Sequence, residues 1–582
     1  MQVVHVPRWS RLLSLAPLAL LVVSACSQGP VTYTGSQPRT PIEKIPSGGE
    51  MKNFQLVGQN QLLDPKFNLP RGMGGGITAI RDCLYAGSSI AYQPTLILDM
   101  KDLTKPTVVG EVPGIAGKGM GIEAIEAVGD LNLLVNTARN SKGWTEAPPK
   151  VAPADTNVGL VVYDATDCKK PTIVSKIDVK NTFLHYMTLW RDPNKPDRVF
   201  VSVTYNSGVP EDGVDVRVWD LTGCPKSCNP KLAGEWGLRA QLGIPANVTT
   251  KYEGGTRVDN TQTHDVTWSL DGRRMHLAQT KYGYLQIDSS ALAEGRSCDP
   301  SPAKSKTEAG HCLSVLPDFK PLAAFGTEVA NVHGVVSIPG RPYVAIQHEG
   351  HACPFGGITF AYIGDKDTFS TYDRQTGQLV APGGAGSVGV FRGDLYPRNV
   401  GTFAIPEQNP DRCPRQGDQI PPTTAATGIY GADVMRSSKT VHNALAFPSV
   451  LFATWYGAGL RAIDITNPSS PFELGYFFNK PVPEVRYCSE GSAGPCDKPE
   501  LDAEGVPVRV KQLLPPDVFA RSYPILMNGH IVYYDENSGI YVLKYTGPHA
   551  NELPQTGLCI SHNPNVVTPG FEPCAPYKTW SP

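Results

Sequence analysis

The feature that most constrains this sequence is a unit that recurs along it. Each unit is a run of alternating apolar residues that ends in Asp, then a turn that contains Pro, then a second run that ends near Gly. Clear copies cover 95–110, 159–175 and 459–475, and further copies begin at Val216 and Tyr284. Alternation with a period of two, interrupted by turn residues, is typical of paired antiparallel strands. Because segments with a helical period are almost absent, the chain is expected to be nearly all β.

A second hairpin precedes each copy, as at 264–278 and 442–454. Two hairpins per unit form a four-stranded sheet, which is one blade of a β-propeller. The units begin near Gly75, Glu123, His185, His264, His333, His442 and Arg521. The sequence therefore predicts an all-β, seven-bladed β-propeller with long insertions, the longest of them between Pro406 and Lys439.

The seventh unit lacks a fourth strand, because it runs through 539–544 and then reaches Gly547-Pro548. The segment 54–58 resembles the last strand of the first unit, 108–110. We expect this N-terminal strand to complete the last blade, which would close the ring and remove its exposed sheet edges. The propeller is thus predicted over 51–547, followed by a disulfide-pinned C-terminal tail over 548–582.

The first 25 residues are predicted to be a signal peptide. Arg8 and Arg11 precede an apolar run over 12–23 that is too short to span a bilayer comfortably. Cys26 follows Ser-Ala, which resembles the lipobox of bacterial lipoproteins, where the thiol is acylated and becomes the new N-terminus. The alternative is an ordinary cleaved signal with an unrelated cysteine.

The segment 26–50 is rich in Pro, Gly, Ser and Thr, and is predicted to be a flexible tether. Together with the leader, it predicts an exported protein held on a membrane by its lipid, on the periplasmic or cell-surface side. The composition offers no basic stripe, and the formal net charge is −2, so no nucleic acid is expected as a partner.

The chain contains 13 cysteines, so 12 remain when Cys26 is assigned to the lipid. An even number in an oxidising compartment indicates disulfides. The expected pairs are Cys83–Cys168, Cys224–Cys228, Cys298–Cys312, Cys353–Cys413, Cys488–Cys496 and Cys559–Cys574. Cys224 and Cys228 have the spacing of half a zinc site, but no second close pair with matching spacing supports that alternative.

Four of the seven units place histidine at the start of the innermost strand: His185, His264, His333 and His442. Innermost strands line the central channel of a propeller, so these side chains are predicted to converge at one level. Only 12 of 582 residues are histidine, which makes such a coincidence unlikely by chance. Several imidazoles together suit copper, iron, zinc or nickel. The pattern predicts one transition-metal ion; the alternative is a polar ring without metal.

Two other blades place charged residues at the same position. Glu123 is expected to hold a ligand ring or to bind the ion directly, and Arg521 to face an anionic substrate. Elsewhere, His348 and His351 have the spacing of a metal motif without the helix that would align them. His276 is expected to be exposed or packed within its strand, and His530, His549 and His562 to lie at the surface. No phosphate loop, dinucleotide fingerprint or Gly-x-Ser-x-Gly elbow is present, so no nucleotide cofactor is expected.

The repeat unit resembles the LVIVD repeat of exported bacterial proteins, and 96–99 and 462–464 carry the match. More distantly, 452–456 followed by 460–468 is similar to one repeat of the selenium-binding protein family, which includes the periplasmic methanethiol oxidases. That resemblance implies a copper-dependent oxidoreductase, and export also favours copper over iron or zinc. Carotenoid-cleaving oxygenases, similar in having seven blades and four histidines, imply iron.

The LVIVD resemblance implies a different function. Propellers of that type often act without chemistry, as surface binding or scaffold proteins. The insertions at 142–157 and 406–439 would then contact a protein partner, whereas an enzyme would take a small-molecule substrate at the channel. Bound metal is the observation that separates the two hypotheses.

Overall fold

The computed structural model describes residues 49–560 except for internal gaps, the longest of which are 141–157, 316–331, 364–396, 407–439, 486–499 and 510–517. The predicted signal peptide, Cys26 and most of the tether and tail lie outside the described residues.

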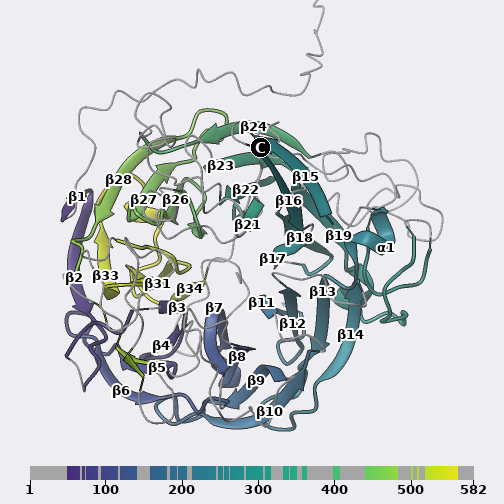
Figure 1. The fold of residues 1–582 in the computed structure, drawn as a ribbon, viewed down its shortest axis with the longest axis horizontal. Helices are drawn as coiled ribbons and strands as arrows, with labels where there is room; N and C mark the ends of the chain where they lie inside the picture. The colour runs from purple at the N-terminus through teal and green to yellow at the C-terminus, as the bar shows by residue number, and fades with distance from the viewer. Residues whose placement is uncertain are drawn as a thin grey trace, which may run out of the picture.

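Seven sheets stand around a central channel, as Figure 1 shows, so the predicted seven-bladed propeller is confirmed. Within the described part of the chain, no helix combines the length and apolar character needed to cross a bilayer.

The first four blades follow one another along the chain, and each sheet has four strands in sequence order from the channel outward. Blade 1 contains β3 (Gly74–Ile80), β4 (Cys83–Ser88), β5 (Leu96–Asp99) and β6 (Thr107–Glu111). Blade 2 contains β7 (Lys118–Val128), β8 (Leu133–Asn140), β9 (Val158–Asp164) and β10 (Thr172–Asp178). Blade 3 contains β11 (Leu184–Arg191), β12 (Val199–Tyr205), β13 (Val216–Asp220) and β14 (Lys231–Trp236). Blade 4 contains β17 (Thr263–Trp268), β18 (Arg274–Gln279), β19 (Gly283–Asp288) and β20 (Ser314–Val315).

The last three blades complete the ring. Blade 5 contains β21 (Val332–Ser337), β22 (Tyr343–His348), β23 (Ile358–Tyr362) and β24 (Arg398–Phe403). Blade 6 contains β25 (Ala444–Ala446), β26 (Val450–Thr454), β27 (Leu460–Asp464), β28 (Phe472–Phe478) and an added outer strand, β1 (Glu50–Lys52). Blade 7 contains β31 (Ile525–Met527), β32 (His530–Asp535), β33 (Gly539–Tyr545), the outer strand β2 (Phe54–Asn60) and β34 (Leu558–Ile560).

Among the described residues, two hairpins and two short α-helices lie outside the blade pattern. The hairpins are β15 (Asn247–Tyr252) with β16 (Gly255–Asn260), and β29 (Glu500–Leu501) with β30 (Pro507–Arg509). The helices are α1 (Leu238–Leu242) and α2 (Ser290–Glu294).

The middle strands of the blades are largely buried, and β12 and β26 are buried along their whole length. Adjacent blades pack face to face, so both sides of such a strand lose contact with water, and apolar residues fill both. Outer strands are more exposed; β6 has four exposed residues out of five. The alternation of the repeat is therefore clearest where one side of a strand faces solvent.

The ring closes through β2, as the sequence predicted. Phe54 pairs with Tyr545 and Asn60 with Ile540 in an antiparallel ladder between the two ends of the propeller. Two further pairings were not expected. Glu50, assigned to the tether, pairs with Phe478 as part of β1. Beyond residue 547, β34 pairs with β31 on the channel side of blade 7.

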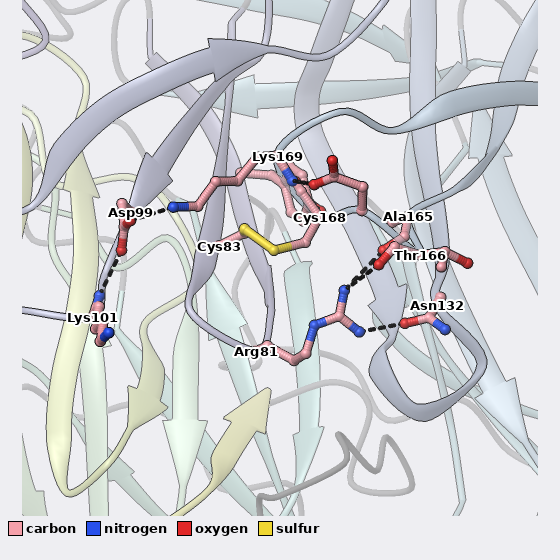
Figure 2. The surroundings of a disulfide bond; sticks show 11 residues. Arg81, Cys83, Asp99, Lys101, Asn132, Ala165, Thr166, Cys168 and Lys169 are labelled. Carbon is pink, nitrogen blue, oxygen red and sulfur yellow. Dashed lines mark hydrogen bonds and ion pairs between the residues drawn. A yellow bond between two sulfur atoms is a disulfide. The ribbon is translucent and has the colours of Figure 1, made fainter.

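Disulfides join cysteines that the sequence had paired. The structure contains Cys83–Cys168, Cys224–Cys228 and Cys298–Cys312. The other expected pairs fall on residues, or on side chains, outside the described ones. Figure 2 shows the first bridge, which ties β4 of blade 1 to the turn between β9 and β10 of blade 2. The Arg81 guanidinium donates to Asn132 beside it, so the seam between these blades is fixed by covalent and polar contacts.

Candidate metal centre

Three of the four predicted histidines sit at irregularities in the innermost strands, and His442 lies two residues before β25. The register of β11 shifts between Leu184 and Met187, and that of β17 between Thr263 and Asp265. The register of β21 shifts between Val332 and Gly334. The residues skipped by the ladder at these bulges include His185, His264 and His333. A β-bulge turns the side chain of its extra residue out of the regular alternation, which aims these imidazoles at the channel axis.

The four histidines converge. Neighbouring imidazole centroids lie 4.2 Å apart for His185 and His264, 4.2 Å for His264 and His333, and 3.9 Å for His333 and His442. The Nε2 atoms of His185 and His264 are 2.8 Å apart. Two nitrogens that share one ion at about 2.1 Å each are separated by about 3 to 4 Å, so this spacing suits a common ion after small adjustment.

Carbonyl groups of the next blade orient two of the rings. His264 Nδ1 lies 3.0 Å from the carbonyl oxygen of His333, and His442 Nδ1 lies 2.7 Å from that of Arg521. A carbonyl oxygen only accepts hydrogen bonds, so the contact of His264 favours an N–H on Nδ1 and a lone pair on Nε2. His442 Nδ1 also lies 2.7 Å from the amide nitrogen of Asn443, which only donates, so its two contacts favour opposite tautomers. Metal-binding histidines are commonly oriented in this way. The backbone of blade 5 thus orients the ring of His264, and the backbone of blade 7 orients that of His442.

His333 differs from its neighbours, because neither ring nitrogen has a hydrogen-bond partner among the described residues. The side chain is 1% exposed, and burial together with the nearby His442 and His264 lowers the pKa of this imidazole well below its usual range. A buried polar group without a partner destabilises the fold by about 1–3 kcal/mol. An ion at this point would give the ring the missing contact.

The structure adds a carboxylate that the sequence did not single out. Glu349 follows directly after β22, and its Oε2 lies 3.9 Å from His333 Nε2. Ligand atoms of His264, His333 and Glu349 all lie within 4.8 Å of one another. The sequence drew attention to the segment through His348, but that imidazole contacts Thr359 Oγ1 within blade 5 at 3.0 Å. His351 lies outside the described residues.

Tyrosines surround the histidines. The Tyr456 hydroxyl donates to Glu349 Oε1, and its ring centroid is 4.8 Å from that of His442. Tyr186 is fully buried, with its ring centroid 5.9 Å from that of His333. Burial raises the pKa of both phenols well above the ordinary value, so both stay protonated donors at neutral pH. Both adjoin predicted site residues, but neither occupies the repeat position that identified the histidines.

The two charged positions form a buried ion network beside the histidines. The Arg521 guanidinium contacts Glu123 and also Glu536, the latter at 3.2 Å. Glu123 Oε2 lies 3.9 Å from His442 Nε2, which agrees with the predicted place of Glu123 near a ligand ring. Arg521 was expected to face an anionic substrate, and the structure places it on two carboxylates instead. Its single positive charge balances at most one of the two carboxylates.

The other described histidines are not part of the channel cluster. His276, on β18, is buried, and its Nδ1 lies 2.7 Å from the Tyr284 hydroxyl. Burial lowers the pKa of His276 and of His348 to about 3, so both are neutral in the fold. His530 and His549 are half-buried rather than fully exposed, and His549 lies against Asp464. His562 is outside the described residues.

Several long connections lead into the innermost strands. The first-to-second strand turns, on the opposite face, are short, as at 81–82, 447–449 and 528–529, but that face also carries the long third-to-fourth strand connections 289–313 and 363–397. The connections that lead into β17, β21, β25 and β31 are long, and they run over 237–262, 316–331, 404–443 and 479–524. Side chains for binding are concentrated in loops held by a rigid scaffold, so these connections are candidates for recognition.

No protein-family profile matches the chain, and no curated protein matches it in sequence. Solved propellers share its general shape. The Cps50 (Swd1) β-propeller domain of Myceliophteria thermophila is 9% identical with a TM-score of 0.40, over 82% of this chain and 99% of that one. Sqt1 of Chaetomium thermophilum is 10% identical with a TM-score of 0.41, over 85% of this chain and 100% of that one. Another structure shows that Sqt1 bound to the N-terminus of the ribosomal protein L10, at 11% identity and a TM-score of 0.38, over 81% and 96%. Similarities at this level carry no functional argument.

Proposed function

We propose that this chain is an exported, lipid-anchored propeller that binds one transition-metal ion in its central channel and uses it for oxidoreductase chemistry. The observation that carries the metal proposal is His333, a buried imidazole with no hydrogen-bond partner for either nitrogen among the described residues. It stands between two other imidazoles and a carboxylate, which is the kind of donor set that copper, iron and zinc accept.

The residues divide into holding and supporting roles. His185, His264, His333 and His442 would hold the ion, and the carbonyls of His333 and Arg521 orient two of the rings. Copper remains the first choice over iron and zinc because of the predicted export. A bound copper or iron ion would supply electron transfer and a coordination position for a small substrate. The Glu123–Arg521–Glu536 network places one guanidinium and two carboxylates next to His442, so it adds no net positive charge there.

The second hypothesis is a non-catalytic surface binding or scaffold propeller. The specific observation in its favour is the 2.8 Å contact between His185 and His264, which can be a hydrogen bond that needs no ion. In that case the ring of histidines is structural, and the long connections at its face would bind a protein partner.

Metal analysis of the purified protein tests the proposal. Protein exported from cells supplied with copper, iron and zinc is expected to carry close to one transition-metal ion per chain by plasma mass spectrometry. A metal-free protein, after loading with each ion has been attempted, would favour the binding hypothesis.

The lipid anchor is tested separately: Cys26→Ser should abolish incorporation of a labelled fatty acid and release the protein from the membrane fraction.

A further inference from the structure

We infer that Glu349 is an oxygen ligand of the channel ion and that Tyr456 is the residue that positions it. The inference rests on the proposed metal function and names a ligand outside the repeated histidine position. Glu349 closes one side of the cluster: its Oε2 faces His333 Nε2 at 3.9 Å, and its carboxylate lies within 4.8 Å of ligand atoms of both His264 and His333.

The two oxygens of Glu349 have different neighbours. Oε1 accepts the hydrogen bond from the Tyr456 hydroxyl, whereas Oε2 faces the imidazole of His333. This arrangement holds the carboxylate by one oxygen and directs the other toward the histidines. Second-shell hydrogen bonds of this kind fix the orientation of a metal ligand and raise affinity.

The backbone at Tyr456 is unusual. Its φ is 26°, in the region that residues other than glycine seldom adopt, and such conformations are retained where the surrounding structure enforces them. The enforcing contacts are visible: the Tyr456 carbonyl accepts from Ala520 of the chain leading into blade 7, and Trp455 donates to the Gly459 carbonyl across the turn. The turn between β26 and β27 is therefore bent in a way that extends the phenol from blade 6 to Glu349 of blade 5.

Opposite charge stabilises a buried carboxylate, because moving it from water into the protein interior costs several kcal/mol. The side chain of Glu349 is 11% exposed. Tyr456 provides a neutral hydrogen bond, and a cation bound beside His264 and His333 would provide the opposite charge. Two histidines and one carboxylate form a recurring set for redox-active iron, and a carboxylate also suits harder divalent ions than an all-imidazole site does.

The test uses the full mature protein and Co²⁺, whose visible absorption reports the ligands around it. The variants are Glu349→Gln, Tyr456→Phe and the double variant. Tyr545→Phe is the matched control, because its hydroxyl is buried and has no hydrogen-bond partner among the described residues. Thermal unfolding of each apoprotein shows whether the fold is kept, and Glu349→Asp, which keeps the charge but shortens the side chain, serves if Glu349→Gln does not fold.

We expect Glu349→Gln to change the Co²⁺ spectrum and weaken binding at least tenfold, and Tyr456→Phe to weaken it about 10- to 100-fold. The double variant should bind no more weakly than Glu349→Gln, since the phenol acts only through the carboxylate. Tyr545→Phe should match the wild type. Independent, additive losses would overturn the positioning role. Normal binding and spectrum in Glu349→Gln would overturn the ligand role alone, whereas a wild type that binds no Co²⁺, Cu²⁺ or Fe²⁺ would overturn both this inference and the proposed function.

Discussion

The imidazole of His264 in blade 4 lies with its Nδ1 3.0 Å from the carbonyl oxygen of His333, the equivalent residue of blade 5. His442 makes the same contact with the carbonyl of Arg521 in blade 7. At these two positions the backbone carbonyl orients the imidazole of the preceding blade, so the site depends on the correct packing of adjacent blades.

Removing single imidazoles should separate ligands from bystanders. We expect His264→Ala and His442→Ala each to lose most of the bound metal while the propeller stays folded, because an incomplete ligand set binds weakly. His530→Ala is a suitable control, since this half-buried residue lies at the start of β32, away from the cluster. His276→Ala would be a poor control, because His276 is buried against Tyr284 and its loss would disturb blade 4. Metal content and circular dichroism measure the two effects, and full metal retention in both ligand variants would contradict the proposed site.

Stability should fall in mild acid. His276 has a pKa of about 3 in the fold, below the ordinary value of 6.5, so the unfolded chain binds a proton that the folded chain excludes. The free energy of unfolding should therefore decrease as the pH falls from about 6.5 toward 3, by up to about 1.4 kcal/mol per pH unit for this group. His348 should add a similar dependence. Urea unfolding at several pH values measures the slope, and His276→Gln should reduce it; an unchanged slope would show that His276 does not contribute.

The closing strand can be tested with two neighbouring side chains. Phe54 is 4% exposed and packs against Phe452 and Tyr545, so Phe54→Ala should lower the free energy of unfolding by about 3 to 5 kcal/mol. Leu56 on the same strand is 45% exposed, and Leu56→Ala should change it by less than about 0.5 kcal/mol. Equal effects of the two substitutions would argue against the closed ring.

The disulfides should differ in their contribution to stability. The Cys83–Cys168 bridge closes a separation of 85 residues, and the Cys224–Cys228 bridge one of 4. In the chain-entropy model, their loss costs about 4.6 and about 1.9 kcal/mol respectively. The paired serine variants should therefore unfold at clearly different urea concentrations.

Thiol titration of the denatured, unreduced wild type should read near zero, and two or more reactive thiols would contradict complete pairing.

Much of the fold could be predicted because its signals are local. Alternating apolar residues and turn residues lie within each unit, so blade number, ring closure by 54–60 and three disulfide pairs followed from the sequence. The strands β1 and β34 were missed because each is very short and gains its stability only from pairing with a preformed sheet edge. Nothing within a three-residue segment distinguishes it from tether or tail.

The sequence by itself determined the repeat, and with it which residue of each blade stands at the start of the innermost strand; that is why four histidines could be identified together. Only the tertiary structure decided what else meets them. Glu349 and Tyr456 are 107 residues apart and occupy no common repeat position, and they touch because blades 5 and 6 are adjacent and the turn at Tyr456 is held in a rare conformation. Periodicity fixes positions along a strand, whereas contacts across the channel depend on bulges, turns and the closure of the whole ring.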